Sequence, residues 1–190
     1  MRRSPGISEL AAPRLEVTRM RRRHLRGVMA IERQVYPRPW SPNLFLSEMT
    51  ESRNRCYLVA RIDREVVGYG GMVCYGEEAH VTNVAVDPLH QRRKIASRLL
   101  HDLIVAAVDM GAEAISLEVR VTNWGAQRLY GRFGFRPVGV RRNYYQEINE
   151  DALIMWLDGI RTPAYRRRLT TIMESVPEGI RPDRAILGRP

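Results

Sequence analysis

Hydrophobic positions recur along this chain with two periods, and each period predicts one kind of element. Alternating or continuous apolar runs bounded by turn residues predict strands. Apolar residues three to four positions apart predict helices with one buried face. The predicted strands are residues 15–18, 56–60, 66–75, 79–86, 114–120, 135–140 and 152–157. The predicted helices are residues 24–35, 43–50, 91–110, 123–133 and, near the end of the chain, 164–175.

The order of these elements predicts an α/β fold. Antiparallel strands come first, and a strand–helix–strand–helix–strand series follows them. Such an order implies one mixed, mostly antiparallel central sheet flanked by helices. A length of 190 residues fits one domain. The predicted divisions are a flexible arm over residues 1–13, the α/β domain over 14–158 and a C-terminal extension over 159–190.

The most informative stretch joins the strand ending at Val86 to the helix that follows. Pro88 disfavours helix at Asp87 and so marks the end of the strand. The first turn of a helix has free backbone N–H groups and a partial positive charge, and both favour a phosphate group. Basic and amide side chains from Gln91 to Lys94 surround that turn. The stretch predicts a diphosphate site, and a solvated basic helix start explains the same residues without a ligand.

The string Gln91-Arg92-Arg93-Lys94-Ile95-Ala96 resembles motif A of the GNAT N-acetyltransferases. In that family, Gln/Arg-x-x-Gly-x-Gly/Ala follows the strand that lines acetyl-coenzyme A. Gln91 and Ala96 match the motif, whereas Lys94 stands where the family has glycine. The resemblance implies that acetyl-CoA contacts a continuous stretch of backbone and side chains. These coenzyme-binding residues are Val84, Ala85, Val86, Arg92, Arg93, Lys94, Ile95, Ala96 and Ser97.

A second constellation resembles motif B of the same superfamily. Its residues are Glu118, Val119, Arg120, Asn123, Ala126, Leu129, Tyr130, Phe133, Gly134 and Phe135. Pro39-Trp40-Ser41 and Arg141-x-x-Tyr144-Tyr145 are further similar to the RimI-type enzymes, which acetylate the α-amino end of ribosomal proteins. The resemblance covers about residues 15–158 and implies the GNAT fold. It also implies that Asn123 holds the pantetheine arm of the coenzyme, although a helix cap explains the same asparagine.

Acetyl transfer needs a neutral amine and a proton for the departing thiolate. At pH 7 an α-amine is neutral in roughly one molecule in ten, but a lysine amine in fewer than one in a thousand. The resemblance assigns Glu118 as general base and Tyr130 as general acid, roles that suit a carboxylate and a phenol. Alternatives are a strand glutamate paired with Arg120 or Arg136, and a tyrosine that only packs in the core.

Lys94 supports two competing hypotheses. In the first, the loop binds acetyl-CoA and the ammonium group adds a phosphate contact. In the second, the side chain crowds the diphosphate. If a left-handed backbone is needed here, a residue other than glycine costs about 1–2 kcal/mol, which corresponds to roughly a tenfold loss of affinity. We expect binding to be retained, because neighbouring amides remain available.

The acceptor cleft is expected between residues 36–41 and 141–145. Trp40, Tyr144 and Tyr145 would bind a peptide N-terminus there, unless they are core residues. The RimI resemblance implies acetylation of the α-amino group of a protein N-terminus, with a ribosomal protein as the expected partner. The alternatives are acetylation of lysine side chains or small amines, which loop variation would permit, and a non-catalytic CoA-binding or ribosome-associated protein.

Composition narrows these classes further. No run of 18 apolar residues predicts a membrane span, and two cysteines without metal-ligand spacing suggest no metal site. No apolar stretch of signal-peptide type follows the basic start, so a cytoplasmic location is expected. The net charge of +10 suggests an anionic partner. However, 30 of the 31 basic side chains are arginines and Lys94 is the single lysine. A general preference for arginine in the composition therefore explains the net charge equally well, and nucleic-acid binding is not favoured. A monomer and a homodimer both remain open.

Overall fold

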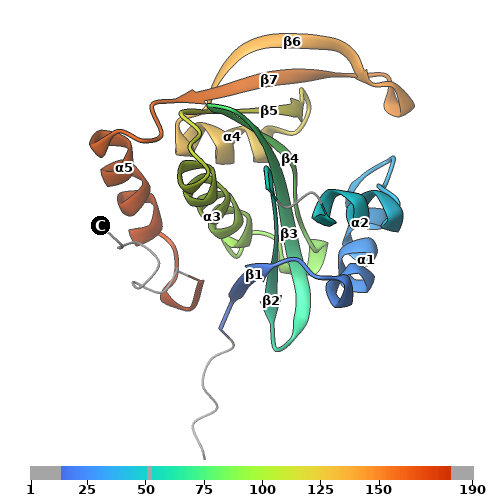
Figure 1. Ribbon diagram of the computed structural model, residues 1–190. Helices are drawn as coiled ribbons and strands as arrows, with labels where there is room; N and C mark the ends of the chain where they lie inside the picture. Colours follow the sequence, from blue (N-terminus) through green and yellow to red (C-terminus); the bar gives the residue numbers. More distant parts are fainter. Residues whose placement is uncertain (1–13, 51–52, 181–190) are drawn as a thin grey trace, which may run out of the picture.

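A single twisted sheet of seven strands forms the centre of the molecule (Figure 1). The computed structural model describes residues 14–50 and 53–180. The strands are β1 (Glu16–Arg19), β2 (Arg55–Ile62), β3 (Glu65–Tyr75), β4 (Glu78–Val86), β5 (Ala114–Arg120), β6 (Arg136–Tyr145) and β7 (Glu150–Asp158). Their order is β1-β2-β3-β4-β5-β7-β6, and only β4 and β5 run parallel. This arrangement confirms the predicted mixed, mostly antiparallel sheet.

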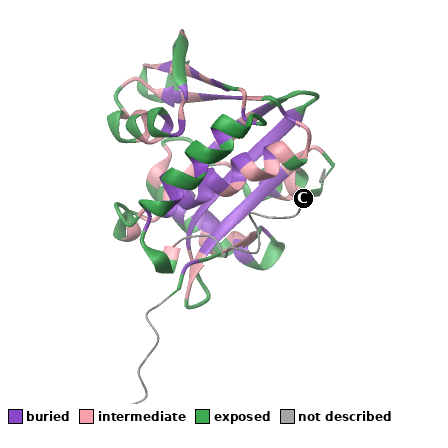
Figure 2. Ribbon diagram, turned by 90° about the vertical axis from the view of Figure 1, so that its left-hand side faces the viewer, coloured by how far each residue is buried: buried purple, intermediate pink, exposed green. Residues whose placement is uncertain are grey.

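Helices cover both faces of the sheet. They are α1 (Leu25–Val35), α2 (Pro42–Thr50), α3 (Ile95–Asp109), α4 (Trp124–Phe133) and α5 (Pro163–Glu174). Alternation along β2 divides the core, because Leu58 and Ala60 pack with α3 whereas Tyr57 and Val59 pack with α1 and α2. In Figure 2 the central strands and the inner faces of the helices are buried, whereas the outer faces of the helices and the edge strand β6 are exposed.

The parallel strands β4 and β5 separate halfway along their length. Their pairing begins at Glu78 and Ala114 and ends at Val81 and Leu117. Beyond this point β4 stays paired with β3 alone, up to Val86. The sheet therefore opens between the second half of β4 and the end of β5. This opening is the structural basis of the site described below.

Helix α3 begins at Ile95, four residues later than the sequence pattern predicted. Arg92 and Lys94 both have left-handed backbones, with φ values of 64° and 66°. A right-handed helix cannot include such residues, so the segment from Gln91 to Lys94 is a loop. At the other end, Gly111 adopts φ 93° after the last turn, which agrees with the predicted cap.

Strand β6 extends further than predicted and includes the segment 141–145. Its pairing with β7 shifts between Arg141 and Tyr145. Asn143, with φ 49°, lies in this irregularity, and its N–H donates to a carboxylate oxygen of Asp151 at 2.7 Å. The predicted cleft wall 141–145 is thus the bulged end of an edge strand, and its Tyr144 and Tyr145 line a cavity.

The described part of the extension packs against the rest of the protein. Helix α5 matches the predicted helix 164–175 and buries Tyr165 and Leu169 in the core that contains α3 and α4. The Tyr165 hydroxyl donates to the carbonyl of Phe133 at 2.9 Å. Residues 1–13 and 181–190, which include the predicted arm, lie outside the described residues. Among the described helices, none is long and apolar enough to cross a bilayer.

Candidate active site

Two cavities meet where β4 and β5 separate. One, of about 650 Å³, lies beside the start of α3 and one face of α4, and is called here the α3 cavity. The other, of about 490 Å³, lies between the α1–α2 connection and the end of β6, and is called the aromatic cavity. Val84 and Tyr130 line both. A reaction between molecules bound in the two cavities would therefore take place beside these two residues.

The α3 cavity collects almost all residues predicted to bind the coenzyme. Those lining it are Val84, Ala85, Val86, Arg92, Lys94, Ile95, Ala96, Ser97 and Asn123. The side chain of Arg93 is not among them. Arg128 and Arg132 line the same cavity from α4, and the sequence analysis missed both. Their spacing of four residues on one helix face was the available signal.

The loop before α3 has the geometry of an anion-binding nest. Arg92 and Lys94 are left-handed, and Lys94 comes directly before the right-handed helix α3; a left-handed residue beside a right-handed one turns successive N–H groups toward one point. The positive end of the 15-residue helix α3 lies directly behind this loop. The two left-handed non-glycine residues cost roughly 1–3 kcal/mol each. The residues present therefore fit a diphosphate group.

The exposed edge of β4 supplies further backbone donors. Asp87 donates its N–H to the carbonyl of Val67 on β3. Every second residue of β4 bonds to β3 in this way, so the alternate residues Val84 and Val86 direct their backbone groups to the opposite side. Two contacts agree with this direction. The Tyr36 hydroxyl donates to the Val84 carbonyl at 3.4 Å, and the Gln91 side chain donates to the Val86 carbonyl at 3.4 Å. Within the described sheet, the N–H groups of Val84 and Val86 thus face the opening rather than a strand.

Asn123 is confirmed as a helix cap, and its role toward the pantetheine arm stays a prediction. Its side-chain oxygen accepts the N–H of Ala126 at 3.1 Å, which caps the first turn of α4. The same residue lines the α3 cavity. The cap fixes the start of the helix that carries Tyr130, so Asn123 positions that side chain.

The aromatic cavity contains the three residues predicted to bind the acceptor. Trp40, Tyr144 and Tyr145 all line it. Trp40 also stacks at a tilt on Phe45, with ring centroids 5.3 Å apart, so the core role and the lining role coincide. Tyr144 and Tyr145 contact each other edge to face at 5.1 Å.

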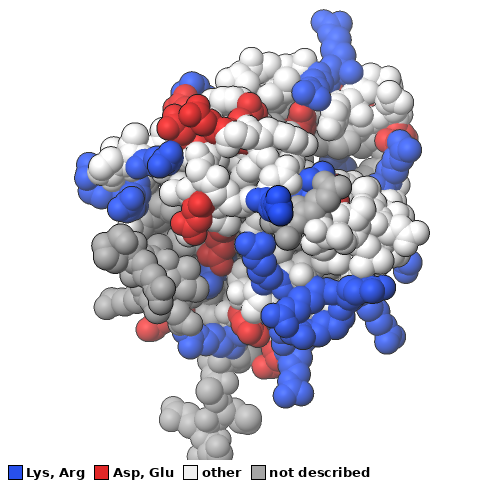
Figure 3. Space-filling view, viewed as in Figure 1, with Lys and Arg blue, Asp and Glu red and all other residues white. Residues whose placement is uncertain are grey.

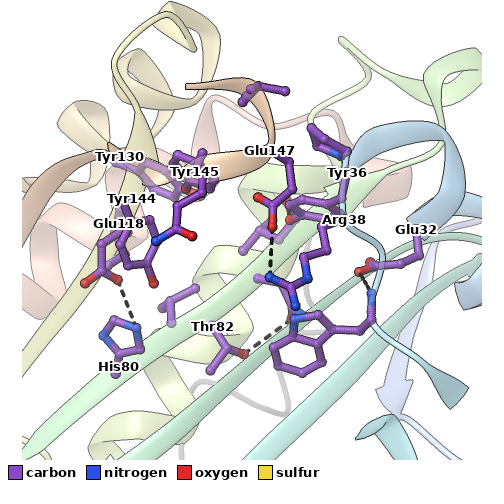
Figure 4. Close-up of a pocket in the computed structure, with 18 residues that line it drawn as sticks. Glu32, Tyr36, Arg38, His80, Thr82, Glu118, Tyr130, Tyr144, Tyr145 and Glu147 are labelled. Atoms are coloured by element: carbon purple, nitrogen blue, oxygen red, sulfur yellow. Dashed lines mark hydrogen bonds and ion pairs between the residues drawn. The ribbon is translucent and has the colours of Figure 1, made fainter. Parts of the chain in front are cut away.

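An ion pair connects the two walls of the aromatic cavity. Arg38, which follows α1, contacts Glu147, which follows β6, at 2.8 Å (Figure 4). Both side chains are well exposed to solvent, which screens the pair, so its contribution to the closed arrangement is small. An incoming peptide can therefore separate these two side chains at little cost.

Glu118 is a buried carboxylate held by two cationic or ionisable partners. Its oxygens contact His80 Nε2 at 3.1 Å and the Arg141 guanidinium at 3.3 Å, and its side chain is 7% exposed. Figure 4 shows Glu118 and His80 pointing toward each other at one end of the cavity. The hydrogen bond from His80 lowers the pKa of Glu118 more than burial raises it. The predicted partners Arg120 and Arg136 do not hold it; Arg136 pairs with Asp158 instead.

Tyr130 packs in the core and also lines both cavities. Its ring contacts Phe135 at 5.7 Å, and it is almost fully buried. Burial raises the pKa of its phenol well above the ordinary value. The hydroxyl therefore stays protonated over the physiological range and is available as a proton donor.

Two ionisable residues of the aromatic cavity, His80 and Glu32, were missed by the sequence analysis. Tyr36 belongs to the predicted wall 36–41 and lines the same cavity. Glu32 is 1% exposed, and one of its oxygens accepts the Trp40 N–H at 2.9 Å. Burial raises the pKa of this carboxyl to about 7. Alternation along β4 could have indicated which face His80 occupies, but the sequence of neither strand specifies the register between β4 and β5.

Comparisons with known proteins agree on one family. The family model described as the Acetyltransferase (GNAT) family matches residues 25–135. A curated relative from Bacillus subtilis (strain 168), named putative [ribosomal protein bS18]-alanine N-acetyltransferase, is 36% identical over 141 residues, or 74% of this chain and 93% of the relative. The N-alpha-acetyltransferase RimI of Mycobacterium tuberculosis is 38% identical over 124 residues, or 63% of this chain and 76% of the relative.

A solved structure of a related enzyme has a similar fold. The ribosomal-protein-S18-alanine N-acetyltransferase from Escherichia coli aligns with a TM-score of 0.69 at 29% identity, covering 76% of this chain and 94% of that one. Members of this family transfer an acetyl group from acetyl-CoA. Taken with the geometry of the two cavities, the chain belongs to the GNAT family of acetyltransferases, is of RimI type, and uses acetyl-CoA as its donor.

Proposed function

We propose that this protein acetylates the α-amino group of a protein N-terminus, with ribosomal protein bS18 or a closely similar protein as its acceptor. One observation carries the proposal. Glu118 of β5 and Tyr130 of α4 both line the aromatic cavity, and Tyr130 also lines the α3 cavity. A relative covered over 93% of its length has a name that specifies the alanine end of bS18. The position of Glu118 and Tyr130 supports their roles as base and acid, and the similarity to this relative supports the acceptor class.

On the donor side, the residues of the α3 cavity would hold acetyl-CoA by its diphosphate and pantetheine arm. The amides of the loop before α3 and the side chains of Arg92, Lys94, Arg128 and Arg132 offer donors for the phosphates. The N–H groups of Val84 and Val86 face the opening and would stabilise negative charge that develops on the thioester oxygen. Bound acetyl-CoA supplies an activated acyl group at the junction with the aromatic cavity.

The lowered pKa of Glu118 limits how it works. Taking a proton from a free α-ammonium group by an ordinary carboxylate costs roughly 5 kcal/mol, and a lower carboxyl pKa makes the transfer harder. Glu118 therefore acts best on a neutral amine, which it orients through a hydrogen bond. As the nitrogen–carbon bond forms, the N–H becomes strongly acidic, and Glu118 can then accept that proton. Tyr130 donates its phenolic proton to the sulfur as the carbon–sulfur bond breaks.

This requirement favours an α-amine over a lysine side chain. The neutral form of an α-amine is roughly a hundredfold more abundant at pH 7. The aromatic cavity is lined by several rings, and its three carboxylates are Glu118, Glu32 and Glu147, of which Glu147 is paired with Arg38. Such walls suit a short, uncharged N-terminal residue.

The test is an acetylation assay that compares acceptor classes. The purified protein would be incubated with acetyl-CoA and three sets of acceptors: peptides with a free N-terminal alanine and no lysine, N-blocked peptides that contain lysine, and small amines. Mass spectrometry would locate the acetyl group. Modification of the free N-termini alone supports the proposal. Preference for lysine or small amines would replace it with those substrates, and turnover of none would contradict it.

The role of Glu118 has its own control within this assay. Glu118→Gln keeps the shape and a hydrogen-bond acceptor but cannot take the proton. We expect turnover to fall roughly 10²–10⁴-fold with coenzyme affinity unchanged. Arg136→Gln is the matched control, since Arg136 pairs with Asp158 away from the junction, and it should retain full activity. The expected cytoplasmic location and the choice between monomer and homodimer remain predictions.

A further inference from the structure

A chain of hydrogen bonds continues from Glu118 along one face of the sheet toward the β3–β4 turn. His80 on β4 contacts Glu118 through Nε2 at 3.1 Å, and its Nδ1 lies 3.0 Å from the hydroxyl of Ser116 on β5. The Ser116 hydroxyl donates to Glu78 at 2.8 Å. The pairing of β4 with β5 places His80 opposite Ser116 and so builds the central link. Four side chains on two strands are thereby connected in one line.

The number of protons in this chain follows from its three hydrogen bonds. Each bond needs one proton. With both carboxylates ionised, the Ser116 hydroxyl supplies one proton and a neutral His80 imidazole supplies one. The proton that completes the third bond is the one that Glu118 accepts during turnover. It can lie on Glu118, on His80 as imidazolium, or on Glu78, and every hydrogen bond is satisfied in each case.

The two ends of the chain lie in different surroundings. Glu118 and His80 line the aromatic cavity. Glu78 is exposed and borders a groove of about 640 Å³ near the β3–β4 turn, the end of β7 and the start of α5. In Figure 3, Asp and Glu side chains gather at the upper left, in this part of the molecule. Besides Glu78, the ionisable side chains of the groove are Tyr75, Glu77, Glu113, Asp158 and Arg161.

Acetylation of an amine requires a route for one proton. A neutral amine has already given one proton to the solvent before it binds. As it becomes an amide it gives a second proton to Glu118, while Tyr130 gives a proton to the departing thiolate. Before the next turnover Glu118 must lose its proton and Tyr130 must regain one from the solvent. A bound acceptor peptide occupies the aromatic cavity and displaces water from it, so the direct way out is blocked while the proton is on Glu118.

We propose that His80, Ser116 and Glu78 conduct this proton from Glu118 to the acidic groove, an inference that rests on the function proposed above. The proton on Glu118 passes to Nε2 of His80. The Nδ1 proton of His80 passes to Ser116, and the serine proton passes to the carboxylate of Glu78. Water then removes it from Glu78, and rotation of the serine hydroxyl with return of the imidazole tautomer resets the chain.

Other ionisable groups surround this chain without completing a second one. On the cavity side they are Arg141, Tyr144 and Tyr145 of β6 and Tyr130 of α4. Arg141 contacts the other oxygen of Glu118 and favours its ionised form, which helps the proton move on to His80. The negative charge of the groove attracts a proton at the opposite end. Both effects direct the proton outward.

Two substitutions interrupt the path without touching the cavities. Ser116→Ala removes the middle link, and Glu78→Gln removes the acceptor at an exposed position where folding is not at risk. Glu77→Gln is the control, because it removes the same charge from the same groove but has no contact with Ser116. Acetyl transfer to a peptide with a free N-terminal alanine would be measured in dilute buffer, and again with added imidazole as an external proton carrier.

The expected result separates proton conduction from structure. Ser116→Ala and Glu78→Gln should lower kcat about tenfold in dilute buffer, leave both KM values within twofold, and recover as imidazole is added. The wild type and Glu77→Gln should not respond to imidazole. Unchanged kcat in both variants, or a loss that imidazole does not restore, would overturn the path. A wild type without activity on free N-termini would instead contradict the proposed function.

Discussion

At the scale of single residues, Lys94 decides how well the loop before α3 is adapted to a diphosphate. It occupies a left-handed position, φ 66° and ψ 12°, where the family motif has glycine. The ammonium group lines the α3 cavity and can compensate in part for the strained backbone. The sequence showed that lysine replaces glycine at this position. The structure adds the left-handed backbone angle, from which the energetic cost of the lysine is estimated.

Lys94→Gly is expected to stabilise the fold and to weaken coenzyme binding. Glycine adopts this backbone freely, so the free energy of unfolding should rise by about 1 kcal/mol. Loss of the ammonium contact should weaken acetyl-CoA binding roughly 2–10-fold by titration calorimetry. Lys94→Gln is the control, which should lose affinity without gaining stability. Undetectable wild-type binding that glycine restores would show instead that the side chain blocks the site.

Glu32 gives stability a pH dependence of its own. Burial raises the pKa of this carboxyl to about 7 in the folded protein, above the ordinary value of about 4.5. The folded state therefore binds more protons between these values, and stability falls as pH rises through that window. The loss approaches about 3 kcal/mol above pH 7. We expect urea unfolding at pH 5 and pH 8 to show this difference.

Glu32→Gln removes the titration while keeping an acceptor for the Trp40 N–H. The difference in unfolding free energy between this variant and the wild type should therefore change in favour of the variant as the pH rises from 5 to 8. A constant difference over that range would mean that Glu32 is ionised throughout in the folded protein.

At the scale of elements, the site depends on where strands separate and shift rather than on where they pair. β4 leaves β5 after Val81, and the β3–β4 pairing shifts between Gly71 and Met72. Amphipathic periodicity predicted nearly every helix and strand, since burial of one face determines it. It could not predict these irregularities, nor the late start of α3. They depend on backbone angles and on contacts between strands distant in sequence.

Gly71 tests the packing at the shift in β3. A Cβ atom there would lie 2.2 Å from the ring of Tyr57 and 2.9 Å from the side-chain oxygen of Asn83. Gly71→Ala should therefore lower the free energy of unfolding by about 1–3 kcal/mol. Gly131→Ala is the matched control, because a Cβ atom at that exposed position of α4 meets nothing within 4 Å. It should raise stability by about 0.5–1 kcal/mol. Equal effects of the two substitutions in thermal denaturation would contradict this account.

At the scale of the whole molecule, positively and negatively charged side chains concentrate in different regions of the surface. Figure 3 shows Lys and Arg side chains concentrated at the lower right and Asp and Glu side chains at the upper left. The net charge of +10 predicted an anionic partner, and the basic lining of the α3 cavity provides a place for one. The acidic groove was not foreseen, because residues from the β3–β4 turn, β5, β7 and α5 form it only in the folded chain.

The sequence located the proposed base and acid better than it located their partners. Motif spacing led to Glu118 and Tyr130, and both line the aromatic cavity. His80 and Arg141 hold Glu118 from β4 and β6, whereas the sequence suggested Arg120 or Arg136. The neighbours of a residue on adjacent strands depend on register, which local pattern does not specify.

A crystal structure of the protein with acetyl-CoA tests the central claim most directly. The account predicts the diphosphate within hydrogen-bond distance of the amides at the start of α3. It also predicts the sulfur between Glu118 and Tyr130 at the junction of the two cavities. A coenzyme bound outside the α3 cavity, or a sulfur atom out of reach of both side chains, would contradict it.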